Sequence, residues 1–124
     1  MTLRSLLVDD NDRFLAAARD LLERQGVAVV GVASTMNEAT RLAGELHPDV
    51  CLVDIDLGEE SGFDLARRLA ESGNGAPRVV LISAYPERDF TDMIADSPAV
   101  GFLPKPDISA ARLEAMLAVE GGGG

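Results

Sequence analysis

Five short apolar runs alternate with five segments of helical periodicity, and this alternation limits the fold more than any other feature of the chain. The runs lie at 6–8, 27–33, 50–53, 78–83 and 100–103. They are apolar at most positions, which is typical of strands that are buried on both faces of a parallel sheet. Strands that alternate with helices favour helical layers on both sides of that sheet. The sequence therefore predicts an α/β domain with five parallel strands.

The helical segments carry start and stop signals as well as apolar stripes. Thr35 and Glu38 form a capping box, Pro86 suits a first helical turn, and Ser109 suits an N-cap. Gly26 ends the first helix, and the segment 57–61 is predicted to be a loop before the third. The inward positions predicted for the five helices are Phe14, Ala18, Leu21, Leu22, Met36, Ala39, Ala43, Leu46, Phe63, Ala66, Leu69, Ala70, Phe90, Met93, Ile94, Leu113, Met116 and Leu117.

Length and charge limit the domain count and the binding partners. With 124 residues, 47% of them apolar, we expect one domain over residues 1–119 and a flexible glycine-rich tail over 120–124. The net charge of −10 would repel nucleic acids and anionic membranes, so we expect this chain to bind neither directly. The apolar runs are shorter than a membrane span, and the single Cys51 suits a reducing compartment. These features predict a cytoplasmic protein.

Acidic residues directly follow two of the apolar runs. Asp9 and Asp10 follow Leu7 and Val8, and Asp54 follows the run 50–53. Ionised carboxylates cannot lie inside a strand that is buried on both faces, so these acids should emerge at the carboxyl edge of the sheet. Clustered carboxylates repel one another, and a site made of oxygen ligands suits Mg²⁺. We therefore expect a magnesium site at this edge, with a phosphoryl oxygen as a further ligand.

The ends of the last two strands supply complementary groups. Ser83 closes the fourth run with a hydroxyl, and Lys105 follows the fifth run with an ammonium group. A Mg²⁺-assisted phosphoryl site needs an acceptor, metal ligands, a hydrogen-bond donor and a fixed positive charge. The four strand ends provide these groups on one edge of the sheet.

Residues 4–119, with these acids, hydroxyl and lysine in order, resemble the receiver domains of two-component response regulators. The resemblance implies a doubly wound, flavodoxin-like (βα)5 fold with a five-stranded parallel sheet in the order 2-1-3-4-5. It implies that Asp54 is the phosphoacceptor and a metal ligand. It also implies that Asp10 binds Mg²⁺ directly, Asp9 often through water, and Asp56 through its backbone carbonyl.

The same resemblance implies a switch. Ser83 matches the hydroxyl residue that turns toward the phosphoryl group, and Lys105 matches the lysine that pairs with that group. Phe102 matches the aromatic residue that rotates inward from an exposed position, which reshapes the face formed by helix four, strand five and helix five. The bond between Lys105 and Pro106 is commonly cis in this family, and Gly58 replaces a frequent proline.

The resemblance also implies partners. The phosphoryl donor would be a histidine kinase or a phosphotransfer protein, and the output would be a downstream protein target or an output domain outside this chain. A homodimer that forms on phosphorylation is a further expectation. The chain would be no enzyme beyond catalysing its own phosphorylation and dephosphorylation.

Three alternatives stay open from the sequence. Residues 54–58 resemble the start of the motif of haloacid-dehalogenase phosphatases, although Leu57 departs from it and the motif lies on the third strand instead of the first. A flavodoxin-like cofactor carrier would share the architecture but would need a phosphate cradle where Asp9 and Asp10 stand. A degenerate receiver would serve only as a protein-interaction module.

Overall fold

The computed structural model describes residues 2–71, 73 and 75–122, and its helices and strands alternate as the sequence predicts. The strands are β1 (Arg4–Val8), β2 (Ala28–Ala33), β3 (Val50–Asp54), β4 (Asp56–Leu57), β5 (Glu60–Ser61), β6 (Arg78–Ser83) and β7 (Gly101–Pro104). The α-helices are α1 (Asp12–Arg24), α2 (Met36–Leu46), α3 (Gly62–Ala70), α4 (Thr91–Ala95) and α5 (Ala110–Gly122). Two 3₁₀ turns, Glu87–Asp89 and Lys105–Asp107, precede α4 and α5.

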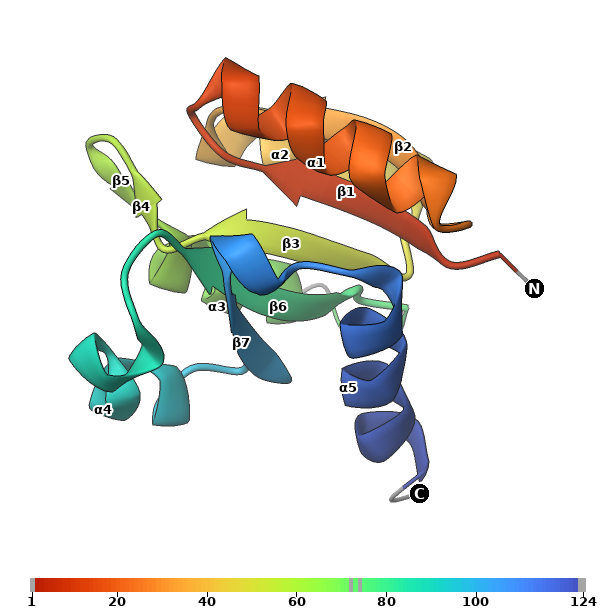
Figure 1. Ribbon diagram of the computed structural model, residues 1–124. Coiled ribbons are helices and arrows are strands. Elements are labelled where there is room, and N and C mark those ends of the chain that lie inside the picture. The colour runs from red at the N-terminus through yellow and green to blue at the C-terminus, as the bar shows by residue number, and fades with distance from the viewer. Residues whose placement is uncertain (1, 72, 74, 123–124) are drawn as a thin grey trace.

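The main sheet has the order β2-β1-β3-β6-β7, and every neighbouring pair in it is parallel (Figure 1). This arrangement confirms the predicted order 2-1-3-4-5 and the doubly wound fold. Alternate strand residues feed two separate cores: Leu6 and Val8 pack with α2 and α3 on one face, whereas Leu7 packs with α1 and α5 on the other. Because both faces are covered, the strands need continuous apolar runs.

Most predicted helix signals are confirmed. Thr35 accepts from the Glu38 amide at 3.2 Å, which is the first half of the predicted capping box; the Glu38 carboxylate accepts at 2.8 Å from the amide of Ser34, one residue before the N-cap, instead of from that of Thr35. Ser109 caps the last helix by accepting from the Arg112 amide at 3.1 Å. The expected domain boundary at 119 stays a prediction, because α5 continues to Gly122 and residues 123–124 lie outside the described part.

Several details differ from the predictions. Residues 57–61 are not a plain loop, because the two-residue strands β4 and β5 pair antiparallel as a small hairpin. The fourth helix is only five residues long and follows the 3₁₀ turn instead of starting at Pro86. Three residues that were predicted to face inward are exposed: Leu21, Ala70 and Met93. Leu21 and Ala70 lie at the margin of the apolar stripes of their helices. Met93 lies on α4, a short helix that buries no residue completely.

Gly62 allows α3 to begin directly against the end of β3. Its amide donates to the Ile55 carbonyl at 2.8 Å, and a Cβ atom at this position would overlap the backbone carbonyl oxygen of Asp54. Because the overlap is with backbone, no side-chain movement can relieve it. The absence of a side chain at residue 62 is therefore a steric requirement of the segment that presents Asp54.

We predict opposite effects for two Gly→Ala substitutions. Gly62→Ala should lower the free energy of unfolding by about 3 kcal/mol, because the added methyl group displaces the β3 backbone. Gly44→Ala, at an exposed helical position with open space around it, should raise the same quantity by about 0.5–1 kcal/mol. Urea unfolding of both variants measures the difference, and a Gly62→Ala variant as stable as the wild type would contradict the packing described here.

Candidate functional site

The acids that follow β1 and β3 meet at the carboxyl edge of the main sheet. β1 and β3 are parallel neighbours (Figure 1), and Val8 lies opposite Val53, so Asp9 and Asp54 follow the two strands at the same edge. Asp9 is 0% exposed and Asp54 is 5% exposed, whereas Asp10 lies on the surface. One carboxylate oxygen from each of Asp9, Asp10 and Asp54 lies within 4.8 Å of the others. The structure therefore brings together the three acids that the sequence predicts to cluster.

Lys105 places its ammonium group between the two buried acids. Its Nζ lies 2.6 Å from Asp9 Oδ2 and 3.2 Å from Asp54 Oδ2, and its side chain is only 16% exposed. The lysine reaches this position because β7 pairs with β6 and the 3₁₀ turn Lys105–Asp107 begins where β7 ends. Lys105 thus supplies one positive charge to a cluster that would otherwise hold only negative charges.

Backbone amides hold the other oxygen of each buried carboxylate. The Asn11 amide donates to Asp9 Oδ1 at 2.9 Å, and the Asp56 amide donates to Asp54 Oδ1 at 3.1 Å. The two Oδ2 atoms therefore face the same ammonium group. Asp9 Oδ2 is fully buried and accepts no well-aligned hydrogen bond, so its contact with Lys105 is an ion pair alone. A second cation near this atom would satisfy it further.

Burial and neighbouring charges shift the pKa values at the site. Burial raises the pKa of Asp54 from 3.8 to about 6; the Asp9 charge adds to this rise, while the Asp56 amide and Lys105 oppose it. Burial lowers the pKa of Lys105, but its contacts with Asp9 and Asp54 more than offset that effect, so the net shift is upward. Lys105 is therefore protonated at neutral pH. Asp54 is mostly ionised at neutral pH, and its ionisation lowers the free energy of unfolding.

The donor set fits a hard divalent cation. Three carboxylates converge, one of them exposed to water and one with a buried oxygen whose described partner is the Lys105 ammonium alone, and Mg²⁺ prefers oxygen ligands at such partly hydrated sites. The Asp56 carboxylate is not in this group, because its Oδ1 accepts from the Gly58 amide at 3.2 Å. The Mg²⁺-binding role expected of the Asp56 backbone carbonyl stays a prediction.

Ser83 lies at the end of β6 and is 2% exposed. Its Oγ accepts from the Tyr85 amide at 2.9 Å, which leaves the hydroxyl proton free to donate to another acceptor. Ser83 is the register partner of Pro104, the residue before Lys105. The hydroxyl and the lysine therefore come from adjacent strand ends.

Two expectations about this region are wrong. Phe102 is 6% exposed and packs in the core shared with α2 and α3, so it does not lie in an exposed position. Its place on β7 explains this, because the side chain points to the sheet face that α2, α3 and α4 cover. The bond between Lys105 and Pro106 is trans, as are all peptide bonds among the described residues.

Two contacts at the site were not predicted from the sequence. The Phe14 ring lies 4.4 Å from Lys105 Nζ, which is the geometry of a cation–π contact. Helical spacing marks Phe14 only as an inward residue and cannot show that a lysine 91 positions later approaches its face. Asn11 caps α1 by accepting from the Arg13 and Phe14 amides, while its own amide holds Asp9. The place of Asn11 directly after the acid pair was the feature of the sequence that could have indicated this capping role.

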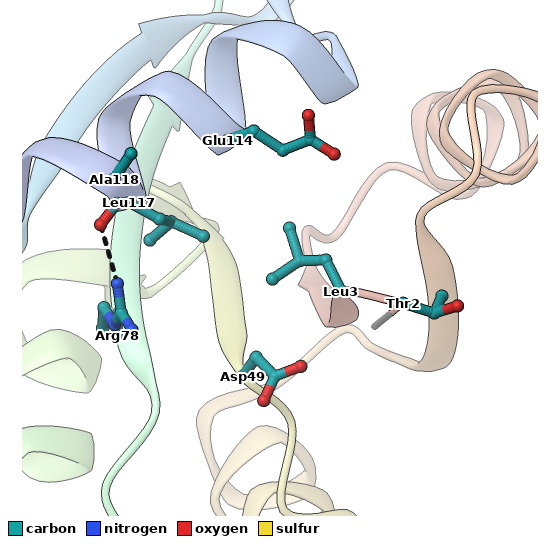
Figure 2. Close-up of a pocket in the computed structure, with 7 residues that line it drawn as sticks. All are labelled: Thr2, Leu3, Asp49, Arg78, Glu114, Leu117 and Ala118. Atoms are coloured by element: carbon teal, nitrogen blue, oxygen red, sulfur yellow. Dashed lines mark hydrogen bonds between the residues drawn. The ribbon is translucent and has the colours of Figure 1, made fainter. Parts of the chain in front are cut away.

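A hollow of about 460 Å³ lies at the opposite edge of the sheet, between the start of β6 and α5 (Figure 2). Two of its polar groups serve the fold: Arg78 donates to the Leu117 carbonyl at 2.9 Å, and Asp49 accepts from the Arg4 amide at 2.9 Å. It lies at the amino ends of the strands, away from Asp9 and Asp54. The acid and lysine cluster is therefore the better candidate for a functional site.

Comparisons with known proteins agree with this geometry. The family model described as the response regulator receiver domain matches residues 6–118. The chain is 30% identical to the transcriptional regulatory protein PdtaR of Mycobacterium tuberculosis over 95% of its length, but it spans only 62% of that protein. It is 32% identical to the polar-differentiation response regulator DivK of Brucella ovis, with 86% of each covered.

A solved structure shows the same fold. The two-component response regulator of the LuxR family from Aurantimonas sp. SI85-9A1 superimposes with a TM-score of 0.83 and 30% identity, covering 98% of this chain and 87% of that one. Within the described residues, no helix combines the length and apolarity needed to cross a bilayer. The family match, the fold and the acid cluster agree, and the chain belongs to the response regulator receiver family, whose members are signalling modules of two-component systems.

Proposed function

We propose that this chain is a phosphoacceptor receiver of a two-component phosphorelay and that Asp54 takes the phosphoryl group. The observation that carries the proposal is the ion-pair cluster in which Lys105 Nζ lies 3.2 Å from a buried Asp54 carboxylate and 2.6 Å from Asp9. Functional sites commonly hold a buried carboxylate with a raised pKa beside a charged partner, which supports the proposal.

In the proposed reaction, Asp54 attacks as a carboxylate. A new bond forms between a carboxylate oxygen and phosphorus, and the bond from phosphorus to the donor's histidine nitrogen breaks, so the electron pair leaves with that nitrogen. Because the Asp54 pKa is about 6, the ionised nucleophile predominates at neutral pH. The Asp56 amide fixes Oδ1, which leaves Oδ2 on the side of Lys105.

Asp9, Asp10, Asp54 and the Asp56 carbonyl would hold Mg²⁺, which when bound neutralises charge on the phosphoryl oxygens. Lys105 would move its ammonium from the carboxylates to a phosphoryl oxygen, a short movement because it already faces Asp54. Ser83 would donate its free hydroxyl proton to another phosphoryl oxygen. Each group then stabilises charge that develops during transfer.

The output would pass through the face formed by α4, β7 and α5, with Ser83 and Phe102 as the moving residues. Since Phe102 is already buried, phosphorylation would change its packing inside the core rather than bring it in from solvent. We propose a histidine kinase or phosphotransfer protein as donor, and a downstream protein or an output domain outside this chain as target. The homodimer and the cytoplasmic location stay predictions.

The family match separates two of the three alternatives from the proposed function, but not the third. A haloacid-dehalogenase-like phosphatase and a flavodoxin-like carrier gain no support, because the receiver family covers residues 6–118 and Asp54 ends the third strand of the chain. A degenerate receiver has the same fold and can be separated only by the chemistry of Asp54.

We predict that acetyl phosphate with Mg²⁺ adds one phosphoryl group to the chain and that Asp54→Ala abolishes the addition. Intact-protein mass spectrometry measures the product directly. Asp20→Ala, which removes an exposed acid on α1 that is not part of the cluster, is the matched control and should be labelled like the wild type. Equal labelling of Asp54→Ala, or no labelling of the wild type, would count against the proposal.

The raised Asp54 pKa predicts a stability change that depends on pH. The folded state holds the Asp54 proton more tightly than the unfolded chain does. Protonated Asp54 therefore contributes to the free energy of unfolding, and this contribution is fully present below about pH 4 and is lost as the pH rises through about 6. Asp54→Asn cannot ionise and avoids the loss. In metal-free buffer it should therefore raise the free energy of unfolding by about 1–3 kcal/mol at about pH 8 and much less at about pH 4.

Urea unfolding at the two pH values measures this difference, with the wild type in parallel. A gain from Asp54→Asn that is equal at both pH values would show that the ionisation of Asp54 is not its cause.

A further inference from the structure

The β4–β5 hairpin (residues 56–61) makes one contact that its own fold does not require. Glu60 Oε1 accepts a hydrogen bond from the backbone amide of Met36 at 2.9 Å, although the two residues are 24 positions apart. Met36 is the first residue of α2, and this amide is one of the donors that the helix cannot satisfy internally. Thr35 and Glu38 already cap the amides of Glu38 and Ser34. A residue from another element therefore completes the start of α2.

The same hairpin carries two residues that border the acid cluster. The Asp56 amide holds Asp54 Oδ1 at 3.1 Å. Gly58, at φ +73°, lies so close to Asp10 that a Cβ atom there would be 3.3 Å from Asp10 Oδ2. The Asp56 carboxylate closes the turn between them by accepting from the Gly58 amide. Any shift of the hairpin therefore moves groups beside both Asp54 and Asp10.

Little else holds the hairpin tip in place. Its strands are two residues each, with Asp56 opposite Ser61 and Leu57 opposite Glu60, and so short a pair is weak without packing. Leu57 is buried in the same core cluster as Met36, which provides an apolar anchor. Among the side-chain hydrogen bonds of the described hairpin residues, that of Glu60 is the one that reaches a distant element. Its length and charge suit it to a helix N-terminus.

We infer that Glu60 is a positioning residue for the metal site: its bond to the Met36 amide fixes the hairpin on α2 and thereby fixes Asp56 and Gly58 around Asp54 and Asp10. This inference rests on the proposed function, since it concerns the Mg²⁺ that the phosphoryl transfer needs. Loss of the bond leaves the carboxylates present but their surroundings less ordered. The affinity for Mg²⁺ then falls, while the rate at saturating Mg²⁺ is preserved.

Four variants of the full chain separate the hydrogen bond from the charge. Glu60→Ala removes both, Glu60→Asp keeps the charge but shortens the reach by one methylene, and Glu60→Gln keeps the length and an acceptor oxygen without the charge. Glu59→Ala is the matched control, because Glu59 is an exposed acid at the turn of the same hairpin. Calorimetric titration of each unphosphorylated protein with Mg²⁺ gives the affinity, and circular dichroism confirms that each variant is folded.

We expect Glu60→Ala and Glu60→Asp to weaken Mg²⁺ binding roughly tenfold, the lower end of the range for residues that orient metal ligands. Glu60→Gln and Glu59→Ala should stay within about twofold of the wild type, because charge beyond the first ligands acts weakly through water. The phosphorylation rate with acetyl phosphate should show the same shift in its Mg²⁺ dependence and should reach the wild-type value at saturation.

Two results would overturn the inference. Equal Mg²⁺ affinities for Glu60→Ala and Glu59→Ala would show that the bond to α2 does not act on the site, and an affinity of Glu60→Gln as low as that of Glu60→Ala would assign the effect to charge. If Glu60→Ala does not fold, the comparison of Glu60→Asp with Glu60→Gln decides. A wild-type chain that binds no Mg²⁺ would instead refute the proposed function.

Discussion

The ion pairs of Lys105 with Asp9 and Asp54 are the interaction on which the site depends. Two buried carboxylates at the ends of adjacent strands would repel each other strongly without a cation between them. Lys105 supplies that cation at 2.6 and 3.2 Å, and the Phe14 ring covers its ammonium at 4.4 Å. One positive charge for two negative ones leaves the cluster with a net negative charge, which favours the binding of a divalent cation.

Strand pairing and backbone contacts place the members of this cluster. Parallel pairing sets Asp9 beside Asp54, and the pairing of β7 with β6 brings Lys105 to the same edge. Backbone amides then orient each carboxylate, and the close approach of Gly62 to the Asp54 backbone fixes the strand end. Glu60 extends this support to α2. The sheet and its short connections thus determine the geometry of the acids and the lysine at the carboxyl edge.

Much of this arrangement could be predicted from the sequence, because apolar runs and strand-end residues report burial and strand direction directly. The five-stranded parallel sheet is confirmed, and Asp9, Asp10 and Asp54 lie together as predicted. The positions of Phe102, the β4–β5 hairpin and the contacts of Phe14 and Glu60 could not be predicted, because they depend on side-chain packing between elements that are distant in the chain. The roles assigned to Asp54, Ser83 and Lys105 in phosphoryl transfer stay predictions.

If Asp54 takes the phosphoryl group as proposed, the Lys105 ammonium exchanges its carboxylate partners for a phosphoryl oxygen. The most direct measurement is the NMR signal of the Lys105 side-chain ammonium on addition of Mg²⁺ and beryllofluoride, which mimics a phosphoryl group on a carboxylate. We expect a clear change in this signal for the wild type and no comparable change for Asp54→Ala. A Lys105 signal that is identical with and without beryllofluoride in the wild type would contradict it.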